Sequence, residues 1–189
     1  MTASAKPRRR WLQFSLKALF GLVVVAAAAC GWLKWKLDRK AALRAAVAEI
    51  RRAGGEVWYD WELAHVRNPP GAGWLRKLLG DDFFSSVVKV ALTHCHHVDD
   101  EWLVHLEPFT DLSAIILDDP QVTDAGLRYL MRFKKLKLLS LGTTAVTDGG
   151  LQHLKGLTEL KELYLDYTAV TDAGVADLQK AIPNCQIRR

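Results

Sequence analysis

The sequence predicts an α/β repeat fold, with a parallel sheet on the concave side of a stack, helices on its convex side, and a transmembrane helix at the N-terminus. Two observations support this: a 24-residue repeat over residues 87–189 and an uncharged apolar run before it. Within each repeat, a strand-like apolar pattern gives way to apolar residues three apart, which is typical of a strand followed by a helix. Neither element can bury its apolar side alone, so the units are expected to stack.

The repeat is clearest in a five-residue motif. TDAGL begins at Thr123, TDGGL at Thr147 and TDAGV at Thr171, and a degenerate copy, DDEWL, begins at Asp99. Each copy follows a strand-like stretch, and the last two stretches have the full pattern L-x-x-L-x-L-x-x-T. We therefore predict four units and a partial fifth strand in residues 87–189.

The motif residues have expected structural roles. The Thr, or the Asp that follows it, is expected to cap the helix N-terminus, where the Asp also suits the helix dipole. The Val before each Thr is expected to fill the core. A turn slot after each strand, held by Cys95, Thr144 and Thr168, is expected to point inward and bond to the backbone of the turn.

This pattern resembles the leucine-rich-repeat family, whose units share the L-x-x-L-x-L core and a Thr, Asn or Cys slot. The stretches VTDAGL, FSLKALFGL and LQKAIPNCQI are similar to those of small membrane-anchored leucine-rich-repeat proteins of planctomycete-type bacteria. The repeat resemblance covers residues 87–189, and the broader one covers nearly the whole chain. It implies an interaction module with no catalytic residues.

The N-terminal region predicts a single-pass anchor. No charge occurs from Ala18 to Leu33, and tryptophans at both ends suit a membrane interface. Two alternatives stay open: a cleaved signal peptide, and a lipoprotein acylated at Cys30, because AAAC followed by Gly resembles a loose lipobox. Positive residues flank both ends of the run, so the side of the membrane on which the repeats lie is undetermined.

The rest of the N-terminal half is expected to connect this anchor to the repeats. We divide the chain into a basic tail (1–11), an anchor (12–37), a helical stalk (38–55), a cap of the repeat stack (56–86) and the repeats (87–189). The stalk is expected to carry a partial apolar face at Ala42, Val47 and Ile50 and to end at Gly54–Gly55. Within the cap, EVWYDWEL suggests a short strand, and the stretch from Gly73 suggests a short helix.

The charge distribution argues against nucleic-acid binding. Residues 1–40 hold nine Lys and Arg and one Asp, a net +8, whereas the whole chain carries +5, so the remainder carries −3. A nucleic-acid-binding domain is expected to have a basic face of its own.

Other chemistry is not expected. Three cysteines make no disulfide framework. A zinc site is disfavoured because the repeat pattern places Cys95 in a buried turn slot; its candidate ligands would be His94, Cys95, His96, His97, Asp99, Asp100 and His105. No nucleophile elbow or phosphate-binding loop occurs, so we predict no enzyme, no metal and no cofactor.

The variable positions of each strand are expected to form a binding face on the concave sheet for a protein or peptide. This face combines exposed apolar and aromatic side chains with an acidic edge. Its predicted residues are Lys89, Ala91, His94, Ile116, Asp118, Asp119, Leu138, Ser140, Tyr164, Asp166 and Tyr167. The alternative is a structural envelope component that assembles laterally and has no specific soluble partner. The sequence leaves the identity of the partner and the oligomeric state open.

Overall fold

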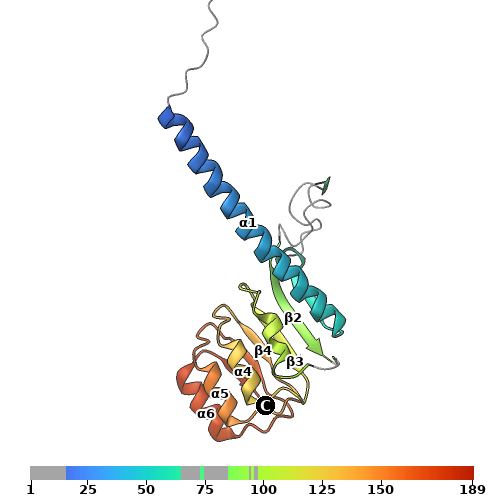
Figure 1. Ribbon diagram of the computed structural model, residues 1–189. Coiled ribbons are helices and arrows are strands. Elements are labelled where there is room, and N and C mark those ends of the chain that lie inside the picture. The colour runs from blue at the N-terminus through green and yellow to red at the C-terminus, as the bar shows by residue number, and fades with distance from the viewer. Residues whose placement is uncertain (1–15, 65–72, 75–84, 94, 96–97) are drawn as a thin grey trace, which may run out of the picture. The chain divides into compact units, whose positions relative to one another are not determined.

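A computed structural model describes residues 16–64, 73–74, 85–93, 95 and 98–189, and the chain divides into two compact units, 1–38 and 39–189 (Figure 1). A single helix, α1 (Leu16–Arg52), begins in the first unit and ends in the second. In the first unit its apolar side chains from Phe20 onward are exposed. Its most apolar 18-residue stretch has a mean hydropathy of 1.5, so α1 is long and apolar enough to span a bilayer, as signal sequences also are.

The second unit is built on a six-stranded sheet in which the strands follow one another in chain order. The first pair is antiparallel and the other strands are parallel. The strands are β1 (Glu56–Tyr59), β2 (Val87–Thr93), β3 (Ala114–Asp118), β4 (Leu138–Ser140), β5 (Glu162–Tyr164) and β6 (Gln186–Arg188). Lys89, Ala114, Leu138, Glu162 and Gln186 lie side by side across the parallel strands. The 24-residue period is therefore the spacing of adjacent strands, with one extra residue between the first two.

A helical segment follows each of the strands β2 to β5. These segments are η2 (Trp102–Leu106), α4 (Asp124–Leu130), α5 (Asp148–Leu151) continued by η3 (Gln152–Leu154), and α6 (Asp172–Ala181). Helices α4, α5 and α6 lie next to one another in Figure 1. The predicted alternation of strand and helix within each repeat is confirmed for the described residues.

The threonines of the repeated motif cap the helices as predicted. The side-chain oxygens of Thr123, Thr147 and Thr171 accept hydrogen bonds from the backbone N–H groups of Ala125, Gly149 and Gly174. Such caps satisfy donors that have no partner within the helix and typically contribute about 1 kcal/mol each.

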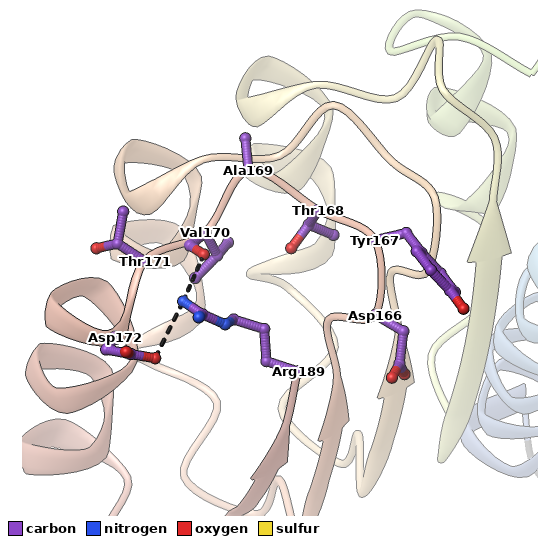
Figure 2. A pocket seen from close by; sticks show the side chains of 8 residues that line it. All are labelled: Asp166, Tyr167, Thr168, Ala169, Val170, Thr171, Asp172 and Arg189. Carbon is purple, nitrogen blue, oxygen red and sulfur yellow. Dashed lines mark hydrogen bonds and ion pairs between the residues drawn. The ribbon is translucent and has the colours of Figure 1, made fainter.

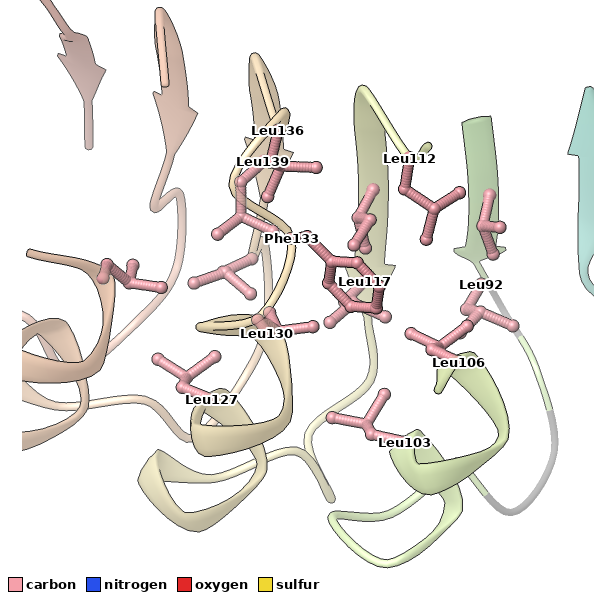
Figure 3. Packing of buried hydrophobic residues seen from close by; sticks show 14 of the residues in the cluster. Leu92, Leu103, Leu106, Leu112, Leu117, Leu127, Leu130, Phe133, Leu136 and Leu139 are labelled. Carbon is pink, nitrogen blue, oxygen red and sulfur yellow. The ribbon is translucent and has the colours of Figure 1, made fainter. Parts of the chain in front are cut away.

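The core lies between the sheet and the helical segments, where the apolar repeat positions meet (Figure 3). Leu117, Leu127, Leu130 and Leu139 are completely buried, as are the valines at 122 and 146, and Val170 is 4% exposed. Each unit thus buries its apolar residues against its neighbours.

The turn slots also follow the prediction. Thr144 Oγ1 donates to the carbonyl of Leu141, and Thr168 Oγ1 donates to that of Leu165, each at 2.8 Å. The Cys95 thiol lies 3.7 Å from the Thr93 carbonyl. The three cysteines are all free thiols.

The end of α1 covers the first strands, which differs from the expected stalk. Ala46, Val47 and Ile50 are buried in the core, whereas Ala42, expected on the apolar face, is exposed. Gly54, with a φ of 92°, ends the helical region as predicted. A helix that packs against a sheet buries more apolar area than a free stalk can, which accounts for the difference.

The segment expected to form the cap is only partly described. The strand predicted in EVWYDWEL ends at Tyr59, and one helical turn, α2 (Asp60–Leu63), follows. The antiparallel pairing of β1 with β2 was not expected. Most of the helix predicted after Gly73 lies outside the described residues.

Candidate functional site

The sheet has one face toward the core, and the side chains on its other face are partly exposed. Along the central strands burial alternates, so that Ile115, Leu139 and Leu163 are completely buried. Their neighbours on the other side are half-exposed and lie side by side across the sheet. We call these side chains the exposed sheet face; they are Lys89, Ala114, Ile116, Leu138, Ser140, Glu162 and Tyr164.

The structure brings five predicted binding residues together on this face: Lys89, Ile116, Leu138, Ser140 and Tyr164. Ala91 occupies the same row but is only 7% exposed, and His94 lies outside the described residues. The centre of the exposed sheet face is therefore apolar, with one hydroxyl between its larger side chains.

On each side of this centre a positively charged side chain packs over an aromatic ring. Lys89 Nζ lies 4.3 Å from the centroid of the Trp58 ring, and the Arg188 guanidinium lies 5.5 Å from that of Tyr164. Tyr164 also donates its hydroxyl proton to Glu162 at 2.9 Å. This hydrogen bond is the main cause that raises the pKa of Tyr164, so the hydroxyl stays a donor at neutral pH.

A hollow with a volume of about 710 Å³ lies where the parallel strands end; we call it the strand-end hollow. It is lined by Asp118, the last residue of β3, and by Asp166 and Tyr167, which follow β5. Tyr167 is 89% exposed, the largest exposure among the described large apolar side chains. Its φ is 60°, and Thr143, one repeat earlier, has a φ of 55°. The full lining is Cys95, Asp118, Asp119, Pro120, Ser140, Gly142, Thr143, Asp166 and Tyr167.

Asp119, predicted on the binding face, is less accessible than that role suggested, whereas Cys95 is buried as its turn slot predicted. Asp119 is only 8% exposed, and its Oδ1 accepts a hydrogen bond from the backbone N–H of Gln121 at 2.9 Å. Burial, and then the charge of Asp119, raise the pKa of the Cys95 thiol. Cys95 is therefore a protonated core residue rather than a nucleophile.

A metal site finds no support in the described part of the chain, which leaves out His94, His96 and His97. No three His, Cys, Asp or Glu side chains gather there in a way that could hold a metal ion.

A second hollow, of about 820 Å³, lies beside the last unit (Figure 2). Arg189 reaches across it, where its Nη1 donates to the Val170 carbonyl at 3.0 Å and lies 3.1 Å from Asp172 Oδ1. Asp166 and Tyr167 line both hollows. Arg189 is already bonded to Val170 and Asp172, so its charge is not available to a ligand in this hollow. These contacts instead join the last strand to the last helical unit.

The motif Asp residues have a role that sequence reasoning missed. In three of the four units this Asp bonds to the Thr of the next unit, accepting its backbone N–H at 2.7–2.8 Å and its hydroxyl at 2.6 Å. The pairs are Asp100 with Thr123, Asp124 with Thr147, and Asp148 with Thr171. The constant Thr-Asp dipeptide was the available signal, but it does not show that the partner lies 23 residues away.

The glycines of the motif make room for these carboxylates. A Cβ at Gly126, Gly150 or Gly174 would overlap the Asp of the preceding unit. The first unit has no such predecessor, and there Trp102 occupies the glycine position. The motif thus describes contacts between units as well as the start of each helix.

No protein-family model matches the chain, and neither does any curated protein sequence. Similar solved structures include a leucine-rich-repeat protein of Leptospira interrogans, 20% identical with a TM-score of 0.35; the match covers 46% of this chain and 27% of that one. Another is the Mex67:Mtr2 subunits of Chaetomium, 12% identical with a TM-score of 0.42, covering 53% and 76%. The chain thus spans about a quarter of the length of the Leptospira protein.

Proposed function

We propose that this protein is a membrane-anchored interaction module that binds a protein or peptide through the concave sheet of a short leucine-rich-repeat solenoid. The observation that carries the proposal is the apolar centre of the exposed sheet face, Ile116 and Leu138, beside Tyr164. Exposed apolar and aromatic groups that cluster on a rigid surface are typical of binding hot spots. No enzymatic activity, cofactor or nucleic acid is part of the proposal.

The repeat geometry supports the solenoid assignment. Each 24-residue unit supplies one parallel strand and one helical segment, and the units contact mainly their neighbours. In stacked repeats of this kind, the sheet forms an extended surface whose side chains can vary without loss of the fold.

The anchor is proposed from the length and composition of α1. Its apolar N-terminal part suits a bilayer, and its described side chains from Phe20 to Leu33 are exposed to solvent rather than packed in a core. Intact mass measured on protein from the membrane fraction tests the anchor. An unprocessed N-terminus supports it, whereas cleavage before or after Cys30 supports the lipoprotein or the signal-peptide alternative.

Binding is tested by panning a random 12-residue peptide library on the full chain in nanodiscs. Enriched peptides should bind the variant Tyr164→Ala with Tyr167→Ala at least about tenfold more weakly, because hot-spot side chains dominate affinity. Met131→Ala is the matched control, since Met131 is 44% exposed but follows α4, away from the sheet. Circular dichroism of each variant checks the fold.

Lateral assembly remains the other outcome of this experiment. If no peptide is enriched and the chain forms higher oligomers in nanodiscs that substitutions at the exposed positions Ala41, Ala42 and Ala45 abolish, the structural role replaces the binding role.

A further inference from the structure

Two lysines lie side by side at one edge of the exposed sheet face. Lys137 comes directly before β4 and Lys161 directly before β5, and both are exposed. The backbone N–H of Lys161 donates to the Lys137 carbonyl at 2.8 Å, so the two side chains leave adjacent strands about 5 Å apart. Like charges this close repel each other, and an anion that contacts both lysines is therefore favoured.

Neither lysine side chain has a hydrogen-bond or ion-pair partner among the residues that the structure describes. Two acids at neighbouring repeat positions are engaged with other groups, because Asp111 accepts a hydrogen bond from Lys135 Nζ at 2.6 Å and Glu162 accepts the Tyr164 hydroxyl at 2.9 Å. The lysine pair is therefore positive charge that the described part of the chain leaves for a ligand.

The apolar centre of the face begins at the very next residue. Leu138 follows Lys137 directly and is half-exposed, and Ile116 lies beside Ser140, two residues further along β4. An extended ligand advances about 3.4 Å per residue, so one that contacts both features needs its acidic and apolar side chains within about four residues of each other. Tyr164, whose hydroxyl is bonded to Glu162, supplies an aromatic ring on the next strand.

We propose that the exposed sheet face binds an acidic, extended peptide segment, whose aspartate or glutamate carboxylate lies between Lys137 and Lys161 while a nearby apolar side chain packs on Ile116 and Leu138. The inference rests on the proposed function and specifies the chemistry of the partner. Complementary charge selects such a segment over neutral or basic ones and speeds its association.

The test uses peptides enriched from the random 12-residue library on the full chain in nanodiscs of uncharged lipid. Enriched peptides should carry a conserved Asp or Glu within about four positions of a large apolar residue. Replacing that Asp by Asn, or that Glu by Gln, should weaken binding about threefold to tenfold, because each exposed ion pair contributes modestly and the carboxylate contacts two lysines.

The chain variant Lys137→Gln with Lys161→Gln should weaken binding of the unmodified peptide by a similar factor. Applied together, the changes in peptide and chain should cost little more than either alone, because they remove one interaction. The control variant, Lys134→Gln with Lys180→Gln, removes two positive charges from exposed positions after α4 and on α6, and it should leave the affinity unchanged. Substitution in the peptide tests the proposal on the native chain, so the result does not depend on the fold of any variant.

The salt dependence of binding gives a second readout. Salt screens exposed charges, so the affinity of the native chain should fall as sodium chloride rises from about 50 mM to about 500 mM. The glutamine variant of Lys137 and Lys161 should lose most of this dependence, whereas the control variant should keep it.

Two outcomes separate this inference from the proposed function. Enriched peptides that lose affinity with Tyr164→Ala and Tyr167→Ala but have no conserved acid, or that bind the glutamine variant of Lys137 and Lys161 as tightly as the native chain, overturn the inference and leave the interaction module standing. Failure to enrich any peptide overturns both.

Discussion

At the scale of single residues, the motif glycines mark the closest contacts between units. Gly150 packs directly on the Asp124 carboxylate, which accepts two hydrogen bonds from Thr147. A methyl group there must displace the carboxylate, and a displaced acceptor leaves both donors unpaired. The cost of such a change comes from the contact between units, not from the helix in which the glycine lies.

We expect Gly150→Ala to lower the free energy of unfolding by about 1–3 kcal/mol, the usual range for overpacking. Gly156→Ala is the control, because a Cβ there meets only the flexible tip of Lys134 at 3.1 Å. Urea unfolding followed by circular dichroism measures both. Equal stability of the two variants would show that the structure accommodates a side chain at Gly150.

Cys185 shows how burial controls a single thiol. Burial, and to a smaller extent the charge of Glu162, raise its pKa to about 11. At neutral pH this thiol is protonated and shielded, and maleimides react with thiolates.

In the variant Cys30→Ser with Cys95→Ser, we therefore expect Cys185 to react with maleimide far more slowly in the native protein than in urea. Replacing Cys185 by Ser and introducing Thr158→Cys at an exposed position gives the comparison thiol. The rates at which the two thiols react with maleimide are measured by mass spectrometry between about pH 7 and pH 8. Native labelling of both thiols at one rate would contradict the burial.

At the scale of elements, the end of α1 is a structural part of the repeat unit. Ile50 is completely buried against the sheet, and Leu43 packs at the edge of the same cluster. The segment resembles a stalk in sequence because only a few of its residues are apolar. Their burial depends on the position of β2, which lies about 40 residues further along the chain and which local periodicity does not describe.

We expect Ile50→Ala to destabilise the unit that contains residues 39–189 by about 2–5 kcal/mol, as for other buried aliphatic side chains. Arg51→Ala, exposed on the same helix, should change the stability by less than about 0.5 kcal/mol. Thermal unfolding of the full chain gives both values. Similar melting temperatures for Ile50→Ala and the wild type would mean that α1 ends as a free stalk.

How well the sequence predicts each element depends on how far apart along the chain the contacting residues lie. The period located every parallel strand, helix cap and turn slot, because these depend on residues within one unit. The antiparallel strand β1, the burial of Ala91 and Asp119, and the Asp–Thr pairs depend on neighbouring units. The apolar centre of the exposed sheet face was predictable from strand alternation, whereas the strand-end hollow required the geometry of four successive turns.

At the scale of the whole molecule, acidic residues tie the units together at their helical and loop sides. The pKa of Asp148 is lowered mainly by the hydroxyl of Thr171, that of Asp111 mainly by Lys135, and that of Asp177 mainly by Lys155. Each pair joins residues 22–24 positions apart, that is, adjacent units. A carboxyl group with a lowered pKa stabilises the fold only while it is ionised.

The folded protein should therefore lose stability as the pH falls below the ordinary aspartate value of 3.8, because the unfolded chain then binds protons more readily than the native one. Urea midpoints between about pH 6 and pH 2 measure the loss. Asp148→Asn should lower the midpoint at pH 6 and make the acid dependence shallower. A midpoint that is constant down to pH 2 would exclude these contacts as a source of stability.

The tryptophan at position 102 has a consequence for how a chain of this kind can change in length. Every unit that follows another needs a glycine at this position, and the first unit lacks it. An internal unit carries both the acid that the next unit uses and the glycine that the previous one requires. A gene duplication of an internal unit would thus yield a longer working array, whereas a copy of the first unit could be placed nowhere but at the start.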